Sequence, residues 1–268
     1  MTVMTTVTEA APTKLPLWRT IGQAYAVWVR NFPELVRICW PWMLLMTPIL
    51  GIWMWWQQPH ILQEMQAAGS GEPFADPNPL LSMATQIGDE VIMLPALASI
   101  AVAWHRLLLR DEHPGPGLYL RFDRIVAGYA ILAFCIGLIT LAPNLILTIN
   151  SDSLGFVAGI ALLVGSFIVA RLSLALPGVA LGRDDVTLGT VWRVSKRNTW
   201  RMVWAYLFCI LPGIAINGGL IYWTSLADHD PAVVTLVWFV MGLLWIPIGM
   251  ISIGMLSIAY RHFFERSA

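Results

Sequence analysis

Charged side chains are scarce in this sequence. They make up 12% of the 268 residues, whereas a soluble domain carries about 25%. Hydrophobic residues make up 57%, and the mean hydropathy is +0.68. So few charges cannot cover a core this apolar in water, which predicts that the surrounding medium is lipid. The zero net charge is uninformative, because the basic and acidic residues are distributed unevenly along the sequence.

Residues that carry chemistry are also few. The three cysteines, Cys39, Cys135 and Cys209, fall inside apolar stretches, so we expect packing roles and no disulfide framework. The five histidines are scattered, and there is no glycine-rich phosphate loop, nucleophile elbow or metal-ligand spacing. We therefore expect no enzyme, no cofactor and no metal site. No basic run is longer than Lys196-Arg197, which argues against a nucleic-acid partner.

Lysine and arginine are missing from every second connection between six apolar stretches. Residues 57–90, 150–153 and 224–231 contain neither, but they hold eight of the sixteen acidic residues. Basic residues concentrate on the cytoplasmic side of membrane proteins. The pattern predicts an all-α membrane helix bundle with six transmembrane helices, both termini in the cytoplasm, and a basic inner face against anionic lipid headgroups.

The predicted organisation is a single membrane domain between two tails. Residues 1–16 are expected to form a disordered cytoplasmic tail, 17–261 the membrane domain and 262–268 a second tail. Amphipathic helices are expected at the inner interface over 17–32 and within 182–201. The six spans are predicted at 38–56, 91–105, 125–149, 154–181, 202–223 and 232–260.

Span two has two interpretations. Only fifteen residues separate Glu90 from Arg106, and they rise about 22 Å, short of the roughly 30 Å hydrocarbon core. In the favoured interpretation Arg106 snorkels while the bilayer thins. In the other, the helix begins near Leu80, and Asp89 and Glu90 enter the membrane.

Arg171 is the strongest single candidate for a functional residue, because it lies inside span four. One interpretation makes it an anion-binding group within the bundle; the other makes it a snorkelling side chain beside a helix break before Pro177. With Arg183, Arg193 and Arg197 it could cradle an anionic lipid headgroup.

Polar and small residues inside the other spans give weaker signals. Asn144 and Asn217 either cap backbone groups near helix breaks or line a polar cavity. Gly242 and Gly249 predict close helix contacts in span six.

Several segments together resemble a known family. Ser99–Arg106 (SIAVAWHR), Arg171–Ala180 (RLSLALPGVA), Thr187–Trp192 (TLGTVW) and the Asn198–Arg201 step (NTWR) resemble a family of uncharacterised six-span bacterial inner-membrane proteins. That family is similar to the membrane domain fused to some glycerophosphodiester phosphodiesterases and to YciC-like membrane proteins. The resemblance implies a bacterial inner-membrane location and directs attention to His105, Arg106 and Arg171, which are candidate residues for binding a lipid headgroup or another anion. It implies no phosphodiesterase activity, because the soluble catalytic domain of the fused relatives has no counterpart here.

Three functions follow as hypotheses. The leading one is a non-enzymatic membrane protein that supports envelope or lipid organisation, by holding anionic headgroups on its basic face or by binding a protein partner. The alternative is a transporter or permeation pathway for a small or lipid-like anion, which needs a cavity reaching Arg171, Asn144 or Asn217. The third is an accessory subunit of another protein.

Overall fold

Helices make up most of the part of the chain that the structure describes. The computed structural model describes residues 14–70, 79–115, 117–149, 151–225 and 230–265. Its α-helices are α1 (Leu17–Arg30), α2 (Phe32–Ser70), α3 (Pro79–Arg110), α4 (Arg124–Ile149), α5 (Ser151–Leu172), α6 (Leu176–Ala180), α7 (Leu188–Ser195), α8 (Thr199–Ser225) and α9 (Pro231–Tyr260). A 3-10 turn, Ser173–Ala175, links α5 to α6, and a π-helical turn, Arg261–Glu265, follows α9.

Six of the described helical segments are long and apolar enough to cross a membrane. They are Phe32–Gln57, Leu80–Arg110, Arg124–Leu147, Leu154–Ala180, Thr199–Leu220 and Ala232–Glu265. The predicted all-α fold with six candidate spans is confirmed. For span two the structure shows the helix start of the less favoured interpretation, because α3 begins at Pro79 and includes Asp89 and Glu90.

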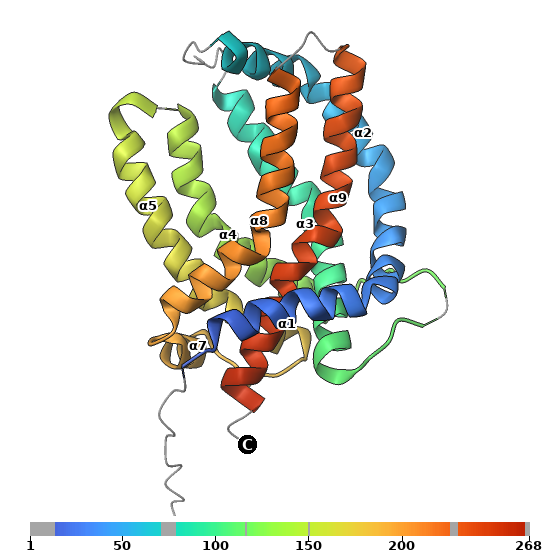
Figure 1. Ribbon diagram of the computed structural model, residues 1–268, viewed down its shortest axis with the longest axis vertical. Coiled ribbons are helices and arrows are strands. Elements are labelled where there is room, and N and C mark those ends of the chain that lie inside the picture. Colours follow the sequence, from blue (N-terminus) through green and yellow to red (C-terminus); the bar gives the residue numbers. More distant parts are fainter. Residues whose placement is uncertain (1–13, 71–78, 116, 150, 226–229, 266–268) are drawn as a thin grey trace, which may run out of the picture.

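The long helices stand side by side, and the short ones gather at one end (Figure 1). The amphipathic helix α1 lies across that end and packs on α8 and α9, while α7 lies nearby below α5. Helices α4 and α5 form a hairpin at one side of the bundle. The described ends of the chain, α1 and the turn after α9, lie at this same end, as an even number of crossings requires.

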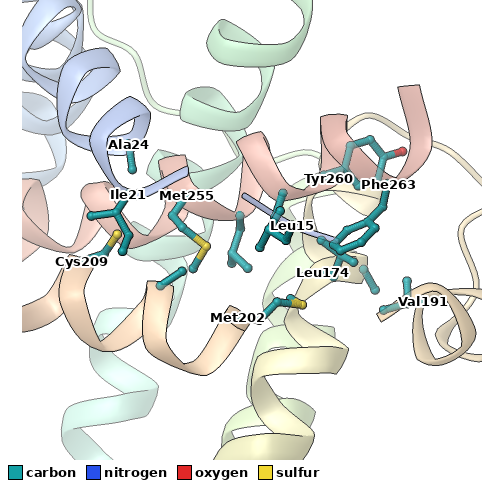
Figure 2. Packing of buried hydrophobic residues seen from close by; sticks show 14 of the residues in the cluster. Leu15, Ile21, Ala24, Leu174, Val191, Met202, Cys209, Met255, Tyr260 and Phe263 are labelled. Carbon is teal, nitrogen blue, oxygen red and sulfur yellow. The ribbon is translucent and has the colours of Figure 1, made fainter. Parts of the chain in front are cut away.

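The segment before α1 is packed, which corrects the prediction of a disordered tail for residues 14–16. Leu15 is fully buried, in the cluster that Figure 2 shows between α1, α8 and α9. Its backbone N–H donates to Asn198 Oδ1 at 2.8 Å, and Arg201 donates to its carbonyl at 2.6 Å. Residues 1–13 of the predicted tail lie outside the described residues. Burial of one leucine is worth about 2 kcal/mol, which fixes α1 against α8.

Proline leaves a backbone carbonyl free inside α8, and a side chain of α1 bonds it. Pro212 has no N–H for the carbonyl of Phe208, four residues earlier. The hydroxyl of Tyr25 on α1 donates to that carbonyl at 2.7 Å. Trp28, one helical turn further along α1, donates to the carbonyl of Pro247 itself at 2.8 Å, which is not the carbonyl that this proline leaves free. The interfacial helix therefore attaches to both C-terminal spans at their proline sites.

Candidate functional site

Arg171 holds the short helix α7 against the end of α5. Its side chain is largely buried, and its Nε donates to Ser195 Oγ at 3.1 Å. A terminal nitrogen donates to the carbonyl of Trp192, and the guanidinium lies 3.4 Å from the centre of the Trp192 ring. The break expected before Pro177 is present as the 3-10 turn just after Arg171. Protein groups therefore engage the guanidinium, and Arg171 fixes α7 against the end of α5.

Arg106 is occupied in a similar way at the end of α3. Its Nε donates to the carbonyl of Ala180 at 2.9 Å, and it pairs with Glu112 at 3.0 Å. Arg110 donates to the carbonyl of Leu181 at 2.6 Å. The last carbonyls of α6 have no partner within that helix, so these two arginines cap it.

His105 lies in the interior, which corrects its prediction as a headgroup contact. The side chain is fully buried. Its Nδ1 is 2.7 Å from Ser257 Oγ, and its Nε2 is 3.3 Å from the hydroxyl of Tyr129. The histidine therefore links α3 to α9 and α4 and is shielded from the surface of the bundle.

Arg193 and Arg197 have their side chains on the surface. Both are exposed, as is Lys196 between them, and neither arginine forms an ion pair among the described residues. Thr187 caps the N-terminus of α7 by accepting from the N–H of Thr190. We name Arg193, Lys196 and Arg197 the α7 patch. It displays three positive charges at the end of the bundle where the short helices gather.

A second basic surface lies beside α1, and the sequence analysis did not single it out. A groove of about 350 Å³ runs between α1 and the end of α9, and Arg19, Gln23, Arg30, Arg261 and His262 line it. Arg19, Gln23 and Arg30 recur at helical spacing on the side of α1 away from its buried stripe. That spacing was visible in the sequence; the approach of α9 to the same side was not.

Other charges at this end are neutralised locally. Arg183 pairs with Asp185 through two hydrogen bonds of 2.9 and 2.5 Å. That pairing holds the pKa of the Asp185 carboxyl below its usual range. Asp123 accepts from the N–H groups of Ile125 and Val126 at the start of α4 and from Arg121. Although partial burial opposes ionisation, these bonds lower the pKa of Asp123.

Asn144 and Asn217 lie apart from the large cavity of the bundle. Asn144 donates to the carbonyl of Thr140 at 2.9 Å within its own helix. The buried Oδ1 of Asn217 has no hydrogen-bond partner among the described residues. A cavity of about 740 Å³ lies between α2, α3, α4, α8 and α9, and neither asparagine nor Arg171 lines it.

Gly242 and Gly249 of span six line this cavity, so the prediction of close helix contacts at these two glycines was wrong. A Cβ added to Gly242 or Gly249 would meet nothing within 4 Å, and both residues line the cavity. The shortest approaches in the described residues occur at Gly213 and Gly88, where an added Cβ would lie 2.5 Å from the rings of Trp245 and Trp53.

Comparison with protein-family models, with curated proteins and with solved structures found no match to the chain. The family resemblance given by the sequence segments therefore stays a prediction. In the described residues, no three histidine, cysteine, aspartate or glutamate side chains gather in a group suited to a metal ion.

Proposed function

We propose that this chain is a non-enzymatic integral membrane protein that binds anionic phosphate headgroups at its basic end. In this proposal the basic end faces the cytoplasm of a bacterium, the spans cross its inner membrane, and headgroup binding contributes to lipid or envelope organisation. The partners are membrane lipids, and no cofactor is involved.

The proposal rests on a difference between two groups of arginines, one bonded to the protein backbone and one exposed. Arg106, Arg171 and Arg201 donate to backbone carbonyls and hold the helices together. Arg193 and Arg197 are exposed and have no ion pair among the described residues. Charge that is not needed for folding is available for an anionic surface, where each basic residue contributes about 1 kcal/mol of attraction.

The groove beside α1 supplies a second, more enclosed place for a phosphate. Arg19 and Arg30 are exposed along it, and Gln23 between them adds an amide donor. Arginine is suited to phosphate because its planar guanidinium donates two parallel hydrogen bonds. Trp18, 70% exposed on the same helix, fits the interfacial layer of a bilayer.

An anion pathway through Arg171 is the weaker candidate. Such a pathway needs a cavity that reaches Arg171, Asn144 or Asn217, and the 740 Å³ cavity reaches none of them. The guanidinium of Arg171 is also engaged by Ser195 and Trp192.

The experiment is headgroup binding to the purified protein in nanodiscs. Membranes with phosphatidylglycerol are compared with phosphatidylcholine membranes, at low and high salt, for the natural chain and for Arg19→Gln/Arg30→Gln. The matched control is Arg183→Gln, which removes a charge already paired with Asp185. We expect the double variant to lose several-fold of the preference for phosphatidylglycerol and the control to keep it.

A competition arm separates a lipid headgroup from a free anion. If soluble glycerol phosphate at millimolar concentration displaces the lipid, the groove recognises the phosphate alone. If it does not, the acyl chains contribute. Equal lipid preference in the natural chain and the double variant would contradict the groove assignment.

A further inference from the structure

A large cavity inside the bundle has walls contributed mainly by five long helices, with Leu176 of α6 added to them. It has a volume of about 740 Å³ and lies between α2, α3, α4, α8 and α9. Pockets that bind small molecules commonly measure about 300–1,000 Å³ and are mostly apolar with a few polar groups. This cavity has both properties, because leucine, isoleucine, methionine, alanine and aromatic side chains form most of its lining.

Three glycines leave the space open. Gly137 on α4 and Gly242 and Gly249 on α9 all line the cavity, and a Cβ built on any of them would meet nothing within 4 Å. Glycine in a helix costs about 1 kcal/mol relative to alanine. At these positions the missing side chains widen the cavity and bring no helices closer together.

Charge is confined to one end of the cavity. Asp89 and Glu90 on α3 are its only charged lining residues in the described part of the chain. Ala101, eleven residues further along α3, lines the other end at a distance of about 16 Å for a rise of 1.5 Å per residue. The cavity is therefore elongated, apolar along its length and acidic at the end away from the basic face.

The acidic end is held in place by aromatic packing. The indole nitrogen of Trp53 donates to Asp89 Oδ1 at 2.5 Å, and Gln57 donates to the same oxygen at 3.1 Å. The Trp53 ring lies over Gly88, which leaves no room for a larger residue. These contacts occupy one carboxylate oxygen of Asp89. Within the described residues, no hydrogen bond or ion pair engages its other oxygen or the Glu90 carboxylate beside it, so both are accessible to a ligand.

We propose that this cavity binds an elongated amphiphile whose cationic ammonium head pairs with Asp89 and Glu90 and whose apolar tail lies along α4 and α9. Two adjacent carboxylates near lipid repel an anionic head and attract a cationic one, and the attraction strengthens as water is excluded. The site is distinct from the α7 patch and from the groove beside α1. Its test can fail while headgroup binding at the basic end stands, and the reverse also holds.

The test uses two rod-shaped fluorescent probes of the same chromophore. One is diphenylhexatriene with a trimethylammonium head, and the other is diphenylhexatriene with a propionate head. Binding to the protein in neutral maltoside micelles is measured by energy transfer from tryptophan, since Trp245 lines the cavity. We expect the natural chain to bind the cationic probe at least tenfold more tightly.

Charge variants test the head of the ligand. Glu90→Gln and Asp89→Asn keep the shape, and the asparagine keeps an oxygen for Trp53. Each should weaken binding of the cationic probe about tenfold, the loss of one close charge–charge attraction, since the trimethylammonium head has no N–H to donate. Binding of the propionate probe should not weaken. The control is Asp111→Asn at the other end of α3, where the positive φ of 57° is one that asparagine accepts.

Filling variants test the tail. Gly137→Leu, or Gly249→Leu as a second variant, should weaken binding of both probes several-fold. The control is Gly51→Leu, whose added Cβ also meets nothing but lies outside the cavity lining. Equal affinities for the two probes in the natural chain would overturn the ammonium assignment. Unchanged binding in both filling variants, each folded by circular dichroism, would overturn the cavity as the site.

Discussion

The hydrogen bond from Tyr25 to the Phe208 carbonyl should stabilise the fold only because Pro212 is present. The Tyr25 hydroxyl donates at 2.7 Å to a carbonyl that α8 itself leaves without an N–H. Tyr25→Phe removes the donor and keeps the ring. An unsatisfied buried carbonyl costs about 1–3 kcal/mol, whereas measured hydrogen bonds between membrane helices average about 0.6 kcal/mol. We expect a loss of about 1 kcal/mol in the free energy of unfolding.

A double-mutant cycle isolates this contribution. In a Pro212→Ala background, the alanine N–H can bond to the Phe208 carbonyl, so Tyr25→Phe should cost nearly nothing. The coupling energy between the two positions should therefore be about 1 kcal/mol. The matched control is a Pro143→Ala background, in which Tyr25→Phe should keep its full cost.

The assay is equilibrium unfolding in mixed maltoside and dodecyl sulfate micelles, followed by circular dichroism. The same loss for Tyr25→Phe with and without Pro212 would refute the reasoning, because the cost would then come from packing of the hydroxyl and not from the freed carbonyl.

Three further predictions follow from single contacts. Asp123→Ala removes the side-chain cap of α4 and should lower the free energy of unfolding by about 1 kcal/mol at neutral pH. Because folding lowers the pKa of Asp123, its ionised carboxylate contributes fully to the free energy of unfolding above the pKa of this residue in the unfolded chain. That contribution disappears as the pH falls through the lower folded-state pKa. The free energies of unfolding of the variant and the natural chain, measured from pH 7 to 3, should therefore converge. Gly213→Val should destabilise the bundle by more than 2 kcal/mol in the same unfolding assay, because an added Cβ lies 2.5 Å from the Trp245 ring, and an undiminished stability would show that the ring shifts freely. Arg171→Gln should release α7, seen as faster proteolysis near Trp192 with the spans intact, and an unchanged cleavage rate would contradict the fastening role.

Much of the fold could be predicted from where charge is missing. The three basic-free and two basic-bearing connections placed five spans within a few residues. The spacing of apolar residues over 17–32 predicted α1. Span two was misjudged because Asp89 and Glu90 were treated as a boundary. In the structure a carboxylate of this pair is satisfied by Trp53 and Gln57 from α2, a tertiary contact that no local pattern shows.

The candidate site was less predictable, because the same residue type serves two purposes. Arg171 and Arg193 look alike in the sequence, but one is fastened to Ser195 and Trp192 and the other faces outward. His105 looked like an interfacial residue beside Arg106, yet it is buried between Ser257 and Tyr129. Which polar side chains remain free depends on how the helices meet, which the one-dimensional pattern does not record.

The account is tested most directly by native mass spectrometry of the protein extracted gently from its own membrane. Its central claim is that exposed arginines bind anionic lipid while buried ones hold the fold. Retained anionic lipid should fall several-fold in Arg193→Gln/Arg197→Gln, with thermal stability unchanged. In Arg106→Gln/Arg171→Gln, stability should fall instead, and the lipid bound per folded molecule should stay the same. Lipid retained in full by the first pair and lost by the second, in molecules that remain folded, would contradict the account.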